Sequence, residues 1–310
     1  MKRGVNLSAI VILLFVLIGL IWGVDALIRA LKKSNSENSS ILSASSEITS
    51  DVEEISTDVE GLETTLESGV PLETVPLEEK NYDTIELSKS DMSKGSLVLV
   101  NSVNKYMADI SGELISFRGK KNETYRLKSY ELMSREEVIN SLNSMFSDFY
   151  NHSSLKNILV ISTYIAQQEN DISTGYSVNI RILNDDSTNL PFTGSGDYSW
   201  IIENCYNYGL IVRYPAEKSS ITGLDDPSYL RYVGKPHSLI IKQNNFCLEE
   251  YTDFLKDYSY DNPLEYENYK IYYVKAVGDK TDAKVPKDST YYVSGNNVDG
   301  FIITVENAVS

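Results

Sequence analysis

Histidine and cysteine are scarce in this sequence of 310 residues, which has only His152 and His237, and only Cys205 and Cys247. Zinc sites built on thiolates need closely spaced cysteine pairs, and these two cysteines lie far apart in the chain. Their spacing therefore excludes a zinc finger or ribbon. Two interpretations of the cysteines stay open: two small buried apolar side chains, or one disulfide if the domain lies outside the cell.

Basic residues are also few. The chain has 28 Lys and Arg against 44 Asp and Glu, which gives a formal net charge of −16. Binding to nucleic acid needs a basic surface to meet the phosphates, so this balance disfavours a nucleic-acid partner. Tyrosine, in contrast, is abundant at 22 residues. A tyrosine-rich surface suits polar polymers, but tyrosine-rich strands also arise from packing alone.

The N-terminal region contains the longest run without charge, "AIVILLFVLIGLIWGV" at residues 9–24. With the residues that follow, this run is long enough to span a bilayer. Because no small-residue cleavage site follows it, we expect residues 1–33 to form a cytoplasmic tip and an uncleaved transmembrane signal anchor. Residues 34–90 are rich in Ser, Thr and Glu and predict a disordered acidic spacer.

The region from residue 91 to 258 mixes helical and strand patterns without a βαβ rhythm, which favours the α+β class. Ser134, with Glu137 three residues later, predicts a capping box that starts a helix. Residues 157–163 and 175–183 are typical of strands. Residues 198–209 and 247–255 predict helices, the first closed by a glycine and the second with a cysteine where an N-cap would be.

The C-terminal part, residues 259–310, has a different pattern. "YKIYYVKAV" and "STYYVSGNNVDGFIITV" are rich in β-forming residues, with turn signals between the runs. This pattern predicts a small β extension packed on the main domain.

Several stretches occur in an order that resembles a known family. They are "LVLVNSVNKY", "INSLNSMFSDFY", "ILVISTY", "TGYSVNI", "WIIENCYNYGLIVRYPAEKSSITG", "RYVGKPHSLII" and "CLEEYTDFL". Their order resembles the zinc D-alanyl-D-alanine carboxypeptidases of the VanY type, over roughly residues 90–258. The resemblance implies a small antiparallel sheet with flanking helices, a zinc site in a cleft, a peptidoglycan stem peptide as substrate and an extracytoplasmic domain.

The three motifs that carry the family's chemistry are changed here. In the motif S-x-H-x-x-G-x-A-x-D, which reads "NDISTGYSVN", the two zinc-ligand positions hold Ile172 and Asn179. In the motif E-P-W-H, which reads "DPSY", the base position holds Asp226 and the third ligand position holds Tyr229.

The third motif, S-G-Y-R, reads "STYI" and has Ile165 where the family's arginine holds the substrate carboxylate. Ser162 and Tyr164 of this motif are kept, and with Ser228 of "DPSY" they are the expected cleft-lining residues. Only "AQQEND" separates this motif from the first ligand position, so we expect part of the family's cleft wall to be missing.

These changes predict the loss of zinc and of catalysis. Isoleucine has no lone pair, asparagine is a weak neutral donor, and tyrosine, with a pKa of about 10, rarely binds zinc as phenolate. We therefore expect no cofactor and no active catalytic residue. The favoured hypothesis is a membrane-anchored, extracytoplasmic pseudo-peptidase that binds a peptidoglycan stem peptide or acts with a cell-envelope protein. Two alternatives stay open: an active carboxypeptidase with a non-standard site, and a protein-interaction module with no wall ligand.

Overall fold

The computed structural model of the chain describes residues 81–106, 108–166 and 170–307. The expected signal anchor and most of the expected spacer lie outside these residues. None of the helices described is long and apolar enough to cross a membrane. The described chain mixes helices with small sheets whose strands pair mainly in antiparallel fashion, so the predicted α+β class is confirmed.

The main sheet has the strand order β3-β5-β6-β9-β8, and β7 pairs with β6 at one edge. All its pairs are antiparallel except β3 with β5. The strands are β3 (Arg126–Leu127), β5 (Ile158–Ser162), β6 (Ser177–Leu183), β7 (Asn189–Pro191), β8 (Leu210–Tyr214) and β9 (Asp226–Tyr232). The strands expected at 157–163 and 175–183 are therefore present as β5 and β6.

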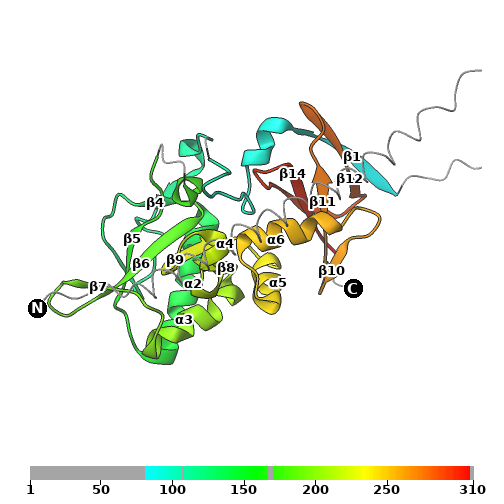
Figure 1. Cartoon of the computed structure of the whole chain (residues 1–310). Helices are drawn as coiled ribbons and strands as arrows, with labels where there is room; N and C mark the ends of the chain where they lie inside the picture. The colour runs from blue at the N-terminus through cyan, green and yellow to red at the C-terminus, as the bar shows by residue number, and fades with distance from the viewer. Residues whose placement is uncertain (1–80, 107, 167–169, 308–310) are drawn as a thin grey trace, which may run out of the picture. The chain divides into compact units, whose positions relative to one another are not determined.

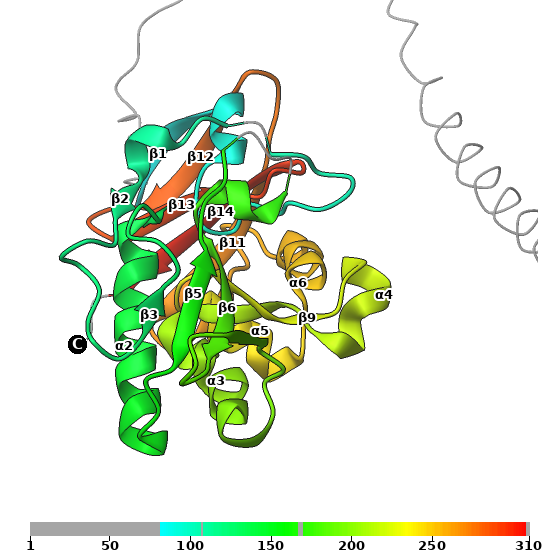
Figure 2. The ribbon, with the colours of Figure 1, turned by 90° about the vertical axis from the view of Figure 1, so that its left-hand side faces the viewer.

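The long helix α2 (Glu136–Ser153) covers one face of the main sheet (Figure 2). Its apolar residues recur every three or four positions, so they share one side of the helix and are fully buried. They pack with Val178 and Ile180 of β6 and Leu230 of β9 in the largest apolar core of the domain. This packing, rather than helix propensity, stabilises the helix.

The predicted capping box of α2 is wrong. The N-cap position is Arg135, and no side chain caps it. Ser134 lies in the short strand β4 (Met133–Ser134), and its hydroxyl donates a hydrogen bond to the Gly175 carbonyl 3.0 Å away. The Ser134 hydroxyl therefore makes a tertiary contact and does not form the helix cap that the local sequence predicts.

The helices expected at 198–209 and 247–255 are confirmed. The first is α3 (Ser199–Asn204), continued by the 3-10 helix η5 (Cys205–Tyr208) and ended by Gly209 at a φ of 75°. The second is α6 (Leu248–Phe254), whose N-cap is Cys247; the Cys247 backbone N–H donates to the Glu250 carboxylate at 2.9 Å. Between them lie α4 (Ser219–Thr222) and α5 (His237–Asn244).

Both cysteines are buried free thiols in this structure. Burial raises the pKa of Cys205 to about 12 and that of Cys247 to about 11. Both side chains are therefore protonated at neutral pH and pack as small apolar groups, which agrees with the first of the two interpretations drawn from the sequence.

The C-terminal β extension is present as a four-stranded antiparallel sheet with the order β10-β11-β14-β13 (Figure 1). Its strands are β10 (Leu264–Tyr266), β11 (Tyr269–Lys275), β13 (Thr290–Gly295) and β14 (Gly300–Glu306). A further strand, β12 (Lys280–Pro286), pairs along its whole length with β1 (Tyr82–Ser88). The expectation that the disordered spacer reaches residue 90 is therefore wrong, because residues 82–88 form a strand.

Short elements complete the described chain: β2 (Ile115–Ser116), which pairs with β4, and the 3-10 helices η1 (Lys89–Ser93), η2 (Ser111–Glu113), η3 (Asp171–Thr174), η4 (Gly196–Tyr198), η6 (Ala216–Lys218) and η7 (Leu255–Asp257).

A second apolar core joins the main sheet to the C-terminal sheet. It contains Ile211 of β8, Ile241 of α5, Tyr251 of α6, and Ile271 and Ile302 of the C-terminal sheet. The two helices α5 and α6 thus lie between the two sheets (Figure 1). The β extension is part of the folded domain and shares its core.

His237 is the first residue of α5 and is buried inside this junction. One ring nitrogen lies 2.7 Å from the Tyr251 hydroxyl of α6, and the other lies 3.0 Å from the Thr304 hydroxyl of β14. Burial lowers the pKa of His237 from 6.5 to about 3. The imidazole is therefore neutral at physiological pH and serves as a hydrogen-bonded link between a helix and the C-terminal sheet.

This link predicts a specific acid sensitivity. Between pH 6.5 and about pH 3 the unfolded chain protonates at this histidine and the folded chain does not. The free energy of unfolding should then fall by about 1.4 kcal/mol for each pH unit of acidification in this window. Urea titrations at a series of pH values measure how the free energy of unfolding changes with pH. In this window the slope of that free energy against pH should be about 1.4 kcal/mol per pH unit steeper for the wild type than for His237→Gln. His152→Gln is the control, because His152 is exposed, and equal slopes for all three proteins would contradict the assignment.

Candidate functional site

The positions predicted from the family motifs meet on three neighbouring strands. Ser162 at the end of β5 is the register partner of Asn179 on β6, and Asn179 is the partner of Tyr229 on β9. Residues from three separate motifs therefore form one row across the sheet. Side chains of directly opposed strand residues lie on the same face, so the row is a single local environment.

A short polar chain extends from this row. The Asn179 side-chain amide donates to the Ser228 hydroxyl at 2.9 Å, and that hydroxyl donates to Asp226 Oδ1 at 2.5 Å. The same Asp226 oxygen also accepts from the Ser228 backbone N–H at 3.0 Å. One oxygen of the Asp226 carboxylate, at the family's base position, is therefore already engaged in hydrogen bonds with Ser228.

Tyr229 is half-buried, and its ring packs against Tyr214 with centroids 5.2 Å apart. Burial raises the pKa of Tyr229 well above its ordinary value. Its phenol is therefore protonated at neutral pH, and burial makes the phenolate harder to form.

The two isoleucine positions differ in exposure. Ile172 lies in η3 and is 4% exposed, whereas Ile165 follows β5 and is 40% exposed. The two segments meet where the Ser173 hydroxyl donates to the Ile165 carbonyl at 3.0 Å. Tyr164 packs against a small apolar cluster that includes Val100 and Ile110.

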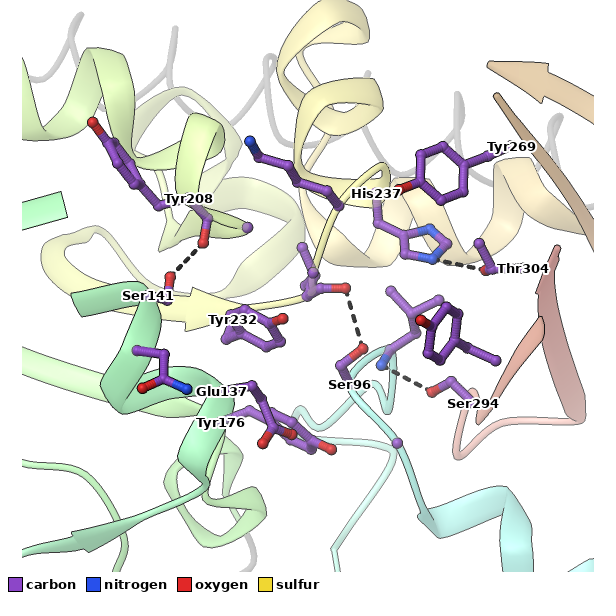
Figure 3. A pocket seen from close by; sticks show the side chains of 18 of the residues that line it. Ser96, Glu137, Ser141, Tyr176, Tyr208, Tyr232, His237, Tyr269, Ser294 and Thr304 are labelled. Atoms are coloured by element: carbon purple, nitrogen blue, oxygen red, sulfur yellow. Dashed lines mark hydrogen bonds between the residues drawn. The ribbon is translucent and has the colours of Figure 1, made fainter. Parts of the chain in front are cut away.

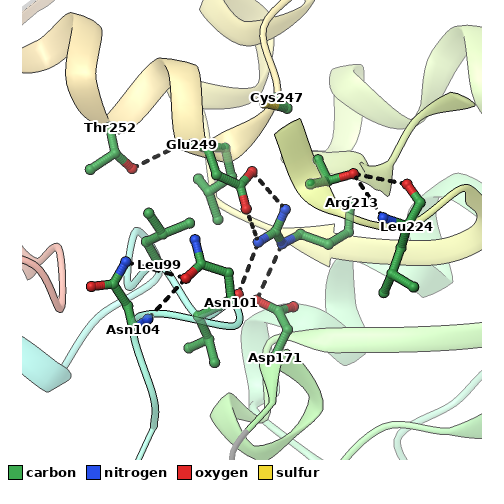
Figure 4. Close-up of polar contacts among 12 residues, drawn as sticks. Leu99, Asn101, Asn104, Asp171, Arg213, Leu224, Cys247, Glu249 and Thr252 are labelled. Atoms are coloured by element: carbon green, nitrogen blue, oxygen red, sulfur yellow. Dashed lines mark hydrogen bonds and ion pairs between the residues drawn. The ribbon is translucent and has the colours of Figure 1, made fainter. Parts of the chain in front are cut away.

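A buried ion cluster lies directly beside the first motif (Figure 4). Asp171, the residue before Ile172, has a fully buried side chain. Its Oδ1 accepts from Arg231 at 2.5 Å and from Arg213 at 3.4 Å, and Ser177 donates to its other oxygen. The aspartate therefore has several charged and polar partners and no contact with solvent.

Both arginines also donate hydrogen bonds to acceptors other than Asp171. Arg213 binds the two carboxylate oxygens of Glu249 at 2.8 and 3.0 Å and the Val100 carbonyl at 3.0 Å. Arg231 donates to the carbonyls of Ser96 and Val98. Burial alone would lower the pKa of Arg213, but Asp171 and Glu249 raise it above its ordinary value. Two cations and two anions thus form a neutral buried cluster that fixes η3 and strands β8 and β9 together.

Asp171 and its two arginines are not among the site residues predicted from the sequence. A signal was present: each arginine lies in an otherwise apolar strand, "LIVRY" and "YLRYV". Because a buried arginine is rarely tolerated without a carboxylate, these strands require an acidic partner from elsewhere in the chain.

The residues at the three predicted ligand positions do not suit zinc, the metal that the family uses. Zinc takes thiolate, imidazole or carboxylate ligands. Here the positions offer an alkyl group, an amide already bonded to Ser228, and a protonated phenol. Within the part of the chain that the structure describes, no group of three or more His, Cys, Asp or Glu side chains could hold a metal ion.

A cavity of about 710 Å³ opens beside the row. Asn179, Asp226 and Ser228 line it, together with the charged side chains of Arg181 and Glu217. Ser162 and Tyr164, the other two expected lining residues, are not among the residues that line this cavity. Its size is typical of a small-molecule or peptide site.

Similarity to known proteins agrees with this architecture. No protein-family model matches the chain. The chain is 30% identical over 248 residues to a D-alanyl-D-alanine carboxypeptidase of Enterococcus faecium, covering 73% of this chain and 80% of the relative. It is 34% identical over 146 residues to the putative carboxypeptidase YodJ of Bacillus subtilis, covering 45% of this chain and 50% of the relative.

Among solved structures, the D,D-dipeptidase VanXYg in complex with a D-Ala-D-Ala phosphinate analogue is similar, with a TM-score of 0.63 and 28% identity. This match covers 73% of this chain and 99% of that structure. The fold and the row of motif positions therefore define a protein of the VanY and VanX type. The chain belongs to the D-alanyl-D-alanine carboxypeptidase family, and the likeness reaches beyond residues 90–258, from which the resemblance was first drawn.

Proposed function

We propose that this chain is a catalytically inactive member of the family that binds peptidoglycan stem peptide in the cavity beside the motif row. The observation that carries the proposal is the pairing of Asn179 with Tyr229 at two of the family's three ligand positions. The fold has brought these positions together, and their side chains do not suit a metal. Loss of the metal ligands from a fold that is otherwise retained explains both facts.

Hydrolysis of a peptide bond by the family's route needs a metal to activate water and polarise the carbonyl. The base position gives a second argument. Asp226 is shorter than the family's glutamate by one carbon–carbon bond, roughly 1.5 Å. Its Oδ1 also accepts two hydrogen bonds from Ser228. A base shifted by this distance loses most of its effect even where a metal is present.

The kept cavity supports a binding role. Two cationic side chains, Arg181 and Lys242, line it together with the amide of Asn179. Ile165 cannot hold a terminal carboxylate as the family's arginine does. We therefore propose that the stem peptide is bound along its length and through its other charged groups. Arg181 would replace part of the contact that the family's arginine makes with the terminal carboxylate.

The location of the protein follows as a further part of the proposal. The apolar run at residues 9–24 would anchor the chain in the cell membrane with its N-terminus in the cytoplasm and its folded domain outside. Peptidoglycan binding requires this orientation. A cell-envelope protein is the alternative partner, and it would need no wall ligand.

Two assays on the purified full-length chain test the proposal. We expect no D-alanine release from a stem pentapeptide ending in D-Ala-D-Ala, and retention of the chain on purified peptidoglycan. Arg181→Glu should reduce the retained fraction severalfold, because it reverses a cavity charge.

Lys287→Glu is the matched control, since it makes the same charge change at an exposed residue that does not line the cavity. Release of D-alanine would favour an active enzyme with a non-standard site. Absence of retention, or an equal loss in both variants, would favour a protein-interaction module.

A further inference from the structure

A second, larger cavity of about 920 Å³ lies between the helix α2, the end of β9 and the C-terminal sheet (Figure 3). Its lining shares no residue with the cavity beside the motif row. The segments that form it are far apart in the described chain, from Gly95 to Glu306. The β extension therefore supplies one wall of this site.

Five of the lining residues are tyrosines. Tyr176 and Tyr232 stack with an interplanar angle of 12° and centroids 6.2 Å apart. Tyr208, Tyr269 and Tyr292 contribute from other elements, and Tyr292 is 60% exposed on β13. A tyrosine ring offers a flat apolar face together with a polar hydroxyl, which suits ligands that have both apolar and hydrogen-bonding surfaces.

Polar side chains in the same cavity are free to bind. Glu137 and Asn140 are exposed on the first turns of α2, and their side chains have no hydrogen-bond partner among the residues described. The hydroxyls of Tyr232 and Tyr292 likewise make no hydrogen bond within the described chain. The cavity thus presents carboxylate, amide and phenol groups that can pair with a ligand rich in hydroxyl and amide groups.

The charges of the lining disfavour an anionic ligand. Glu137 and Glu306 are acidic, and Lys235 is the one lysine or arginine among the lining residues. A phosphate or polyanion site needs a cluster of cations or a helix N-terminus aimed at the anion. The absence of such a cluster from this lining disfavours a phosphate or polyanion, and a neutral ligand is compatible with the lining.

We infer that this cavity binds a neutral oligosaccharide of N-acetylated amino sugars. The apolar faces of sugar rings would stack on Tyr292 and Tyr232, and sugar hydroxyl and acetamido groups would pair with Glu137 and Asn140. The site is separate from the cavity of the proposed function, so the same chain could hold a stem peptide and a glycan at two places. This inference does not depend on the loss of catalysis.

The probe is the soluble β-1,4-linked tetramer of N-acetylglucosamine, which has no stem peptide. Isothermal titration calorimetry with the purified full-length chain should show binding of the tetramer. Tyr292→Ala should weaken this binding about tenfold, which corresponds to the loss of one aromatic contact. Glu137→Gln should weaken it severalfold, because a charged acceptor is replaced by a neutral amide.

Tyr291→Ala and Glu136→Gln are the matched controls, because each is the neighbouring residue in sequence and does not line the cavity. Both should bind the tetramer as the wild type does. The inference is overturned if the wild type does not bind the tetramer at millimolar concentration, or if Tyr292→Ala and Glu137→Gln both bind it unchanged. It is also overturned if a free stem peptide, and not the tetramer, is the ligand that Tyr292→Ala loses.

Discussion

Replacing Asp171 by alanine is expected to lower the free energy of unfolding by about 3–5 kcal/mol, or to prevent folding altogether. The substitution removes the carboxylate that Arg231 binds and leaves Arg213, also buried, with Glu249 alone. It also removes the acceptor of the Ser177 hydroxyl. A buried charge without its partner costs more than the pair contributes, which explains the size of the effect.

Urea unfolding followed by circular dichroism measures this change. Asp185→Ala is the matched control, since Asp185 is an exposed aspartate in the turn between β6 and β7. Its effect should stay within about 0.5 kcal/mol. An Asp171→Ala protein with wild-type stability would contradict the buried ion cluster.

The triple variant Ile172→His, Asn179→Asp and Tyr229→His is expected to bind about one zinc ion per chain. These changes restore the two imidazoles and the carboxylate of the family motifs. The strand register already places positions 179 and 229 opposite each other. Three protein ligands of this kind are sufficient for a catalytic-type zinc site. Elemental analysis after dialysis against zinc measures the stoichiometry.

The double variant that keeps Tyr229 is the control, because two ligands alone should lose the metal on dialysis. A triple variant that folds as the wild type does and still holds no zinc would show that the three ligand positions no longer have the geometry that zinc needs. The restored site lacks the family's glutamate and arginine, so zinc binding is expected without full activity.

The local pattern of the sequence predicted the elements and not their partners. The apolar residues of α2 recur with a 3.6-residue period, a helix signal that depends only on neighbouring residues. Its predicted cap failed because Ser134 bonds to Gly175, which lies far along the chain. The strand β1 was missed for a related reason: its partner β12 lies near the other end of the chain, and an acidic, serine-rich context hides its alternation.

In the candidate site, too, some features were predictable from the sequence and others were not. The row of Ser162, Asn179 and Tyr229 was predictable because three motifs locate it in the sequence. The position of Tyr164 in a separate apolar cluster was not, since its motif says nothing of what packs against it. The tyrosine-lined cavity needs the C-terminal sheet and α2 together, so no single stretch of sequence indicates it.

The most direct test of the central claim is the zinc content of the purified full-length wild-type chain, measured by mass spectrometry after dialysis against zinc-containing buffer. We expect far less than one zinc per chain, unchanged by a chelator. About one zinc per chain, removed by a chelator together with D-alanine release from a stem pentapeptide, would contradict it.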